Sequence, residues 1–478
     1  MMHPSGSPKE LSGELSYLRP FLIDGEIGRL SFFTTFRHFG PPVDECIRLI
    51  KNSNPDLCFF SVFAFCYGDD AIALALAIKK ELKTPVVFGG GGPSAYPDYF
   101  LRQSGIDFVL TGEAEASIGP FLTEIERAHL DFTKVPNLHW KHDGSLHASP
   151  QISAPPKEQI EVGFMKSSET SRAITFSTSL SRGCPKKCNF CSSHLVFGKT
   201  FRMAPIDHIA DALQRFSIDC SDTKKQVVIN LEDDNLLADE SHFKAVITLF
   251  RQHFPGAKFI AENGIDYSFI TPEFCDWLIE NGMQKFNLSL GSLNREILSK
   301  KHRPLHLNRF ERIIGRLSEK GIPSVTYFIC GFKEDTLETI AANLLYLARS
   351  STLVGISMFY PVPGIDGFTD KSIFDTSPSL RCLGSVAYPW NQSLSTETMI
   401  TAFRLSRYIN LLKSSKRSEN ENQLLAIIAN RCELHTMIRE KSGQERIVPV
   451  PRQEKNLVGM VVSGIIDSGL WPLNRAML

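Results

Sequence analysis

The sequence predicts an α/β protein with a doubly wound (Rossmann-like) N-terminal unit, a parallel α/β barrel and a mostly helical C-terminal region. Three observations predict this architecture. Short apolar runs alternate with amphipathic stretches, which is the pattern of parallel strands joined by helices. A proline-rich segment divides two such series within 478 residues, more than one core usually holds. The last hundred residues carry apolar positions at helical spacing.

The first unit spans residues 1–150. Its pattern predicts, in chain order, a helix, a strand, a helix, a strand, a glycine loop, a helix and a strand. The run "VVFGGGGPSAY" places four glycines directly after a strand, where a bare backbone can approach a bulky ligand or simply turn tightly. The usual first strand of such a domain is not recognisable, so we expect the sheet to lack an edge strand. Asp143-Gly144 predicts the turn of a small hairpin.

The second unit spans residues 171–370, after a linker predicted over 151–170. Six apolar or alternating runs, each followed by an amphipathic stretch, predict a parallel α/β barrel; they cover residues 172–184, 226–234, 258–265, 284–292, 323–332 and 353–364. Residues 371–478 are expected to be mostly helical. Ser395 there predicts the N-cap of a helix.

Composition excludes several classes of protein. Apolar residues make up 42% and charged residues 22% of the chain, and 52 basic residues balance 52 acidic ones, so no global field predicts a nucleic-acid or membrane partner. There is no signal-peptide pattern and no apolar run of about 18 residues. Eleven mostly scattered cysteines suit a reducing compartment. We therefore expect a cytoplasmic protein.

The segment "SRGCPKKCNFCSSH" gathers three cysteines, Cys184, Cys188 and Cys191, in a C-x3-C-x2-C spacing. Gly183 and Pro185 favour a loop, so the three thiolates can converge on one centre. Zinc with His194 as fourth ligand is one interpretation, although zinc ligands usually come in pairs from separate segments. The other is a [4Fe–4S] cluster with three protein ligands and one iron open to another molecule.

This loop, with Phe190 just before its third cysteine, resembles the radical S-adenosylmethionine (SAM) superfamily. The resemblance implies a partial (β/α)6 TIM-type barrel and a [4Fe–4S] cluster whose open iron is chelated by SAM. In that family the reduced cluster cleaves SAM to methionine and a 5′-deoxyadenosyl radical.

The resemblance also implies which residues contact SAM. They fall at predicted strand ends, where barrel enzymes build their active sites. The implied contacts are Phe190 beside adenine, Glu232, Asp233 and Asp234 at the ammonium group, Ser289 and Ser292 at the ribose and methionine, and Gly331 at adenine. Each is also an ordinary strand cap or turn residue, and the two interpretations carry similar weight.

The N-terminal unit, with "GGGGPSAYPDYF" followed by "DFVLTGEAEASIGPFL", resembles the cobalamin-binding domain that precedes the barrel in one branch of the superfamily. This implies cobalamin contacts at Ser61, Gly89, Gly90, Gly91 and Gly92. The Asp-x-His-x-x-Gly signature that supplies a lower cobalt ligand is absent. A bound cobalamin is therefore expected to lack a protein ligand below the cobalt.

The resemblance implies a radical SAM enzyme that transfers a methyl group, through cobalamin, to an unactivated carbon of its substrate. The alternatives are cobalamin-independent rearrangement, cyclisation or C–S bond formation of the methylthiotransferase kind, and a non-catalytic iron–sulfur protein. A one-electron donor of the flavodoxin or ferredoxin type is expected as partner. No membrane partner or nucleic-acid module is expected. The sequence assigns no catalytic residue, substrate or oligomeric state.

Overall fold

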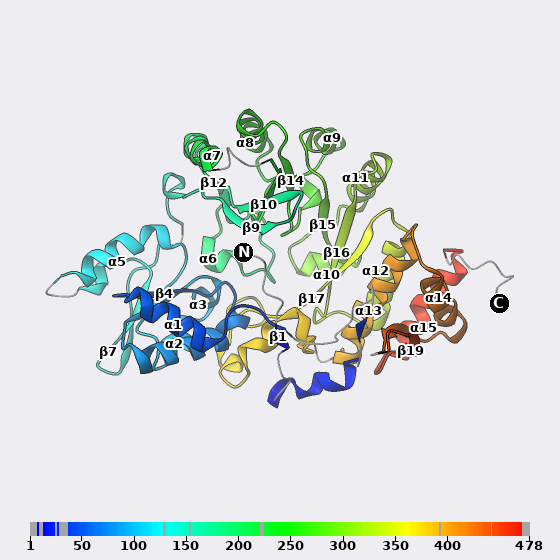
Figure 1. The fold of residues 1–478 in the computed structure, drawn as a ribbon, viewed down its shortest axis with the longest axis horizontal. Helices are drawn as coiled ribbons and strands as arrows, with labels where there is room; N and C mark the ends of the chain where they lie inside the picture. The colour runs from blue at the N-terminus through cyan, green and yellow to red at the C-terminus, as the bar shows by residue number, and fades with distance from the viewer. Residues whose placement is uncertain are drawn as a thin grey trace.

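The computed structural model describes residues 7–8, 13–23, 26–27, 37–127, 131–152, 154–219, 224–391, 393–440 and 442–470. Within them the chain forms an N-terminal sheet domain, a partial barrel and a C-terminal region (Figure 1). The view places the N-terminal domain, in blue and cyan, on one side of the green barrel. The orange and red C-terminal helices lie on the other side. The predicted α/β architecture is confirmed.

The N-terminal domain is a five-stranded sheet in the order β4-β5-β6-β7-β8. Strands β4, β5 and β6 are parallel, whereas β7 and β8 are antiparallel. The bounds are β4 Cys58–Ser61, β5 Val86–Gly89, β6 Phe108–Leu110, β7 Leu138–His142 and β8 Ser145–Ala148. The helices of this domain are α1 Val43–Ser53, α2 Gly68–Glu81, α3 Gly91–Ala95, α4 Pro97–Leu101 and α5 Ile118–Ile125.

One sequence expectation for this domain is met. Asp143 and Gly144 join β7 to β8 with φ angles of 49° and 74°, so the predicted hairpin forms on its expected turn dipeptide. Among the described residues, no strand pairs with the free side of β4, and the missing edge strand stays a prediction. The described two-residue strands near the N-terminus, β1 Ser7–Pro8, β2 Glu26–Ile27 and β3 Arg37–His38, pair elsewhere.

The barrel contains the six predicted parallel strands in sequence order. They form two sheets, β14-β13-β10 and β15-β16-β17, with β9 (Met165–Glu169) antiparallel at the edge of the first. Isolated bridges, Phe259 to Met283 and Ile265 to Leu288, connect the two sheets. The bounds are β10 Ala173–Thr178, β13 Gln226–Leu231, β14 Lys258–Ile260, β15 Phe286–Gly291, β16 Ser324–Cys330 and β17 Leu353–Met358.

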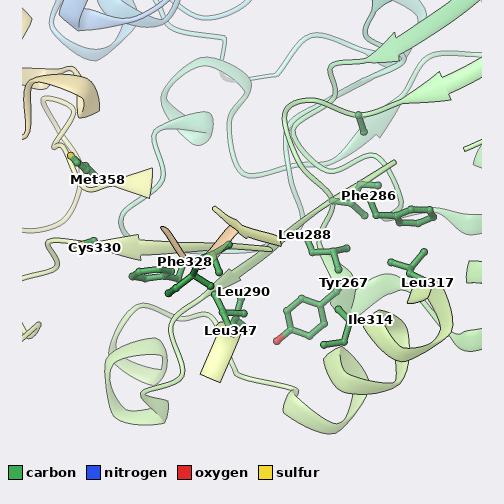
Figure 2. Close-up of a cluster of buried hydrophobic side chains, with 14 of the residues drawn as sticks. Tyr267, Phe286, Leu288, Leu290, Ile314, Leu317, Phe328, Cys330, Leu347 and Met358 are labelled. Atoms are coloured by element: carbon green, nitrogen blue, oxygen red, sulfur yellow. The ribbon is translucent and has the colours of Figure 1, made fainter. Parts of the chain in front are cut away.

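Helices cover the outer side of the barrel strands (Figure 1). Their bounds are α7 Ile206–Asp219, α8 Glu240–His253, α9 Pro272–Glu280, α11 Leu307–Glu319 and α12 Leu337–Arg349, and a short helix, α10 Arg295–Lys300, follows β15. Helix α11 buries Phe310, Ile313, Ile314 and Leu317, the spacing of one helical face. Figure 2 shows Ile314 and Leu317 in one apolar cluster with Phe286 and Leu288 of β15. This packing fixes the strands whose carboxyl ends carry the site.

After β17 the chain crosses to the N-terminal domain before it enters the C-terminal region. Asp69 and Ser379 exchange hydrogen bonds, and the Tyr96 hydroxyl donates to Asp375 at 3.0 Å. The Phe374 ring is buried in the core of the sheet domain. Residues 363–391, which we call the strap, therefore hold the N-terminal domain to the barrel. The strap contains the short 3₁₀ helices η7 Lys371–Phe374, η8 Ser379–Cys382 and η9 Gly384–Val386.

The C-terminal region is mostly helical, as predicted. It also contains a β-hairpin that the sequence analysis does not predict. It contains α13 Thr396–Lys413, α14 Glu419–Arg431, β18 His435–Arg439, β19 Glu445–Pro449 and α15 Lys455–Asp467. The Ser395 side chain accepts a hydrogen bond from the Thr398 amide, so the predicted N-cap is confirmed. Among the residues described, no helix is both long and apolar enough to span a bilayer.

Several short elements complete the described chain. They are η1 Gly13–Phe21, η2 Phe65–Tyr67, η3 Ala114–Ala116, η4 Phe132–Lys134, η5 Lys157–Gln159, β11 Ser181–Arg182, α6 Ser193–Phe197, β12 Arg202–Met203 and η6 Tyr267–Phe269. Of these, β11 and β12 pair with each other and enclose the cysteine loop between them.

Candidate active site

The three clustered cysteines line one cavity of about 510 Å³ at the carboxyl ends of the barrel strands. Cys184, Cys188 and Cys191 lie in the loop between β11 and β12, which follows β10. The opposite walls come from the segments after β13, β14 and β15, through residues such as Asp234, Asn263 and Ser289. Strand ends far apart in the sequence therefore meet around the thiols.

The cysteine loop is anchored by a buried carboxylate. One Asp233 oxygen accepts hydrogen bonds from the Leu180 amide at 2.9 Å and from the Ser181 hydroxyl at 2.5 Å. Gly183 follows with a φ of 76°, and a side chain there would run into the carbonyl oxygen of Thr200. These contacts fix the backbone immediately before Cys184.

Each of the three sulfurs lies near a hydrogen-bond donor. The Asn235 amide donates to the Cys184 sulfur at 3.2 Å, and an Arg303 guanidinium nitrogen lies 3.9 Å from the Cys188 sulfur. The Ser193 amide donates to Cys191. These donors solvate sulfur atoms that carry negative charge.

Burial favours the protonated form of two of these thiols, Cys184 and Cys191. Burial raises the pKa of Cys184, and desolvation by the cavity walls raises the pKa of Cys191 to about 11, although its side chain is open to the cavity. Iron binding must therefore displace these protons. Among the described residues, no three His, Cys, Asp or Glu side chains are arranged to hold a single metal ion.

The donor set fits a [4Fe–4S] cluster with one iron left for another ligand, because three thiols and no fourth cysteine line the cavity. His194 also lines the cavity, so zinc with His194 as the fourth ligand stays an alternative prediction. The cavity also offers polar groups on three strand ends, and its volume is in the range of small-molecule sites. It can therefore accommodate SAM beside the cluster.

A charged network connects the cysteine loop to the opposite wall of the cavity. Asp266 forms ion pairs of 3.6 Å with both Lys186 and Arg303. Burial alone would raise the pKa of Asp266, but the two cations outweigh it and hold the pKa below its ordinary value. Arg303 also donates to the hydroxyl of Ser289 at 2.8 Å. Ser289 thus lines the cavity as predicted, with its hydroxyl oriented by Arg303.

Two more predicted SAM contacts line the cavity. Asp234 accepts a hydrogen bond from Ser193 at 2.6 Å, and burial raises its pKa. Phe190 packs edge-on against Phe332, with ring centroids 5.2 Å apart. Phe332 directly follows Gly331, so the aromatic before the third cysteine lies close to the end of β16.

The other predicted SAM residues lie outside the lining. Glu232 accepts hydrogen bonds from Ser177 and Asn230, and Asp233 holds the start of the cysteine loop. Ser292 is fully buried and its oxygen accepts from the Asn294 amide at 3.1 Å. Gly331, with φ of 112°, allows close packing of Met399 and Phe359. Direct contact of these four residues with SAM stays a prediction.

Three of the predicted cobalamin residues, Gly90, Gly91 and Gly92, pack against the loop after β4. A Cβ atom on Gly90 would lie 2.7 Å from the Val62 carbonyl oxygen, and one on Gly91 would run into the Phe63 carbonyl oxygen. A Cβ on Gly92 would meet Ala64 and Phe65 at 3.1–3.2 Å. Because these glycines have no side chains, the loop after β4 packs directly against their backbone. The contacts of Ser61, which is exposed, and of Gly89 with a ligand stay predictions.

The chain itself also covers the carboxyl ends of strands β5 and β6 in the N-terminal sheet. Helix α6, just after the cysteine loop, packs on α3, and the carbonyl oxygen of Val196 lies 3.4 Å from a Cβ placed on Gly112. Arg202, at the end of the loop, forms an ion pair with the buried Glu113 that follows β6. The glycine run is therefore packed against the chain's own loop, and cobalamin binding at these residues stays a prediction.

Sequence reasoning missed several residues of the cavity wall. Asn235 and Asp266 directly follow predicted strand ends, which is a signal that could have found them. Arg303, His302 and Lys199 lie on connecting loops without a pattern that marks them. Their position depends on how the barrel brings the loops together.

Comparisons with known proteins agree with the fold and the cysteine loop. Residues 178–347 match the model of the Radical SAM superfamily. The bacteriochlorophyllide d C-12(1)-methyltransferase of Chlorobaculum tepidum is 26% identical over 192 residues, which cover 40% of this chain and 41% of that protein. The cytidylyl-2-hydroxyethylphosphonate methyltransferase of Streptomyces wedmorensis is 19% identical and covers 72% and 68%. The chain thus spans less than half the length of the first of these relatives.

Two solved structures share the fold. TsrM from Kitasatospora setae, a radical SAM methyltransferase with cobalamin and a [4Fe–4S] cluster bound, aligns with a TM-score of 0.56 and 17% identity over 67% of this chain and 68% of its own. The cobalamin-dependent radical enzyme OxsB aligns with a TM-score of 0.52 and 15% identity over 78% and 54%.

The cysteine loop at the mouth of a partial barrel and the family match define the class of this part of the chain: residues 178–347 form a radical SAM domain. The sheet domain followed by that barrel has the fold of the cobalamin-dependent members TsrM and OxsB, which confirms the fold of the suspected branch.

Proposed function

We propose that this protein is a radical SAM enzyme that transfers a methyl group to an unactivated carbon of its substrate. The observation that carries the proposal is the convergence of Cys184, Cys188 and Cys191 on one polar cavity at the strand ends. Three thiols leave one cluster iron for SAM, and the remaining lining residues can bind a charged amino acid.

The residues of this chain divide the task. The three cysteines hold the cluster, which when bound supplies one electron to cleave SAM. Asp234 and the Arg303–Ser289 pair present opposite charges and hydroxyl groups to the amino-acid end of SAM. Phe190, backed by Phe332, offers an aromatic face to adenine. Ser289 lies in β15 and Asp234 shortly after β13, whereas Arg303 and Phe190 lie on loops that are held by the contacts to Ser289 and Phe332.

Methyl transfer is supported by the relatives, two of which are methyltransferases, and cobalamin as the methyl carrier by the fold shared with TsrM and OxsB. In the N-terminal domain, Phe63 is 81% exposed and Tyr67 is 47% exposed. Such large aromatic surfaces after β4 favour an apolar ligand lying on this loop.

One observation favours a second candidate, radical chemistry without cobalamin. The described sheet order β4-β5-β6-β7-β8 has no reversal of strand order, whereas ligands of doubly wound domains bind at such a reversal. The glycine run is packed against the chain's own loop. Rearrangement, cyclisation or C–S bond formation would then be the reaction.

Reconstitution separates the candidates. The full chain is reconstituted anaerobically with iron, sulfide and excess hydroxocobalamin, desalted, and assayed for iron and cobalt. Retention of about one cobalamin per chain supports methyl transfer, whereas far less with a full cluster supports the second candidate. A cluster-loaded protein that never cleaves SAM would be a non-catalytic iron–sulfur protein, against both.

We also propose a reducing, cytoplasmic setting and an external one-electron donor of the flavodoxin or ferredoxin type. The described cysteines are all free thiols, which supports that compartment.

A further inference from the structure

The cavity of the proposed active site contains an uneven set of charges. Its three carboxylates, Asp234, Asp266 and Asp366, all have partners within the cavity wall. Asp234 accepts from Ser193, and Asp366 accepts from Asn189 at 2.8 Å. Asp266 lies in its ion pairs with Lys186 and Arg303. Only Asp266 is paired with cations, and the four lysine and arginine side chains of the lining, Lys186, Lys187, Lys199 and Arg303, exceed its three carboxylates by one.

Four basic side chains of the same cavity have no such partner in the described part of the chain. They are Lys187 and His194 on the cysteine loop, Lys199 just after α6, and His302 on the loop before α11. Lys187, Lys199 and His302 are exposed, so they stand at the rim. Basic side chains thus face the cavity both from the segment around the cysteines and from the loop before α11.

The cofactors of the proposed function do not use up this charge. A [4Fe–4S]2+ cluster with three thiolates carries one net negative charge, and SAM carries one net positive charge. The two cancel, which leaves the excess positive charge of the cavity lining unchanged when both are bound. A cavity with uncompensated positive charge attracts and retains anions.

We propose that the substrate of this enzyme carries a phosphate-type dianionic group, which Lys187 and Lys199 bind at the rim of the cavity with His302 opposite. The inference rests on the proposed radical SAM function and names the class of its substrate. Lysine ammonium groups are suited to phosphate because they act as mobile point charges rather than planar forks. The dianion would hold the reacting carbon of the substrate beside SAM.

The competing use of these lysines is to bind the carboxylate of SAM itself. The two uses are separated by measuring two affinities on the same protein. Inorganic pyrophosphate serves as the probe. The cluster-loaded full chain, saturated with SAM, is titrated with pyrophosphate by calorimetry under anaerobic conditions, and SAM affinity is measured separately.

Wild-type protein should bind pyrophosphate. Lys187→Gln and Lys199→Gln should each weaken that binding about fivefold, with SAM affinity changed less than about twofold. Lys80→Gln, an exposed lysine on α2, is the matched control and should change neither.

Three results would overturn the proposal: no pyrophosphate binding to the SAM-loaded protein, equal binding by all variants, or a loss of SAM affinity equal to the loss for pyrophosphate. Cleavage of SAM by the same wild-type preparation is recorded in parallel. Failure of cleavage refutes the radical SAM function, whereas cleavage without pyrophosphate binding refutes only the substrate class.

Discussion

Asp233 offers a sharp test of how the chain holds its cysteine loop. Its side chain is 2% exposed, and one oxygen accepts from the Leu180 amide and the Ser181 hydroxyl just before Cys184. The other oxygen has no hydrogen-bond partner. Asp233→Asn keeps an acceptor oxygen without the charge, and Asp233→Ala removes both.

The difference in the free energy of unfolding between the two variants measures the contribution of the acceptor oxygen. In Asp233→Ala, two buried donors lose their partner, and each unpaired buried group costs about 1–3 kcal/mol. We therefore expect a free energy of unfolding about 2–4 kcal/mol lower for the alanine variant than for the asparagine variant. Reconstituted Asp233→Ala should also hold less iron, because its cysteine loop is less well fixed.

The pH dependence of stability measures the contribution of the charge on Asp233. Burial, only partly offset by these hydrogen bonds, raises the pKa of Asp233 to about 6, from 3.8 in an unfolded chain. Between these values the folded protein binds the extra proton, so stability falls as pH rises from about 4 to about 6 and is level above that. The loss amounts to about 3 kcal/mol relative to Asp233→Asn, which lacks the titrating group.

Urea unfolding of the full-length apo-protein, followed by circular dichroism from pH 4 to 8, provides both comparisons. The reasoning is refuted if the alanine and asparagine variants unfold within about 0.5 kcal/mol of each other. It is equally refuted if the difference between wild type and Asp233→Asn does not change with pH.

Three further predictions follow from the same geometry. Asn235→Leu removes the donor to the Cys184 sulfur, so the reduction potential of the cluster, followed by electron paramagnetic resonance, should shift to more negative values; an unchanged potential would exclude this contact. Ser289→Ala removes a hydroxyl that Arg303 orients, and SAM affinity should fall about fivefold at unchanged iron content; unchanged affinity would show that SAM binds elsewhere. Gly90→Val forces a side chain against the Val62 carbonyl at a φ of 100°, so the protein should lose about 3 kcal/mol of stability, whereas Gly119→Ala, in open space on α5, should not; a stable Gly90→Val protein would mean that the loop after β4 can move.

The sequence predicts the barrel well because each strand and helix there carries its own periodic pattern. Strand β16 buries alternate residues, and α11 buries positions three and four apart, as their sequences indicate. The cysteine loop was predictable for another reason. Its chemistry depends on three thiols that are close together in the chain. Residues that are close in the chain stay close in the folded protein.

The parts that could not be predicted depend on contacts between distant segments. Arg303 reaches Ser289 and the Cys188 sulfur only because two loops meet at the barrel mouth. The glycine run was interpreted as an opening for a ligand, but its small size equally suits the approach of the loop after β4. A run of glycine predicts close approach without saying of what.

The central claim is that Cys184, Cys188 and Cys191 hold a cluster that cleaves SAM. The most direct measurement is the amount of 5′-deoxyadenosine formed when the anaerobically reconstituted protein is reduced with dithionite in the presence of SAM. The account predicts 5′-deoxyadenosine from the wild-type protein and none from the variant with all three cysteines changed to alanine, which should also lack the brown chromophore. Four irons retained per chain in that triple variant, or a wild-type protein that binds a full cluster yet forms no 5′-deoxyadenosine, would contradict it.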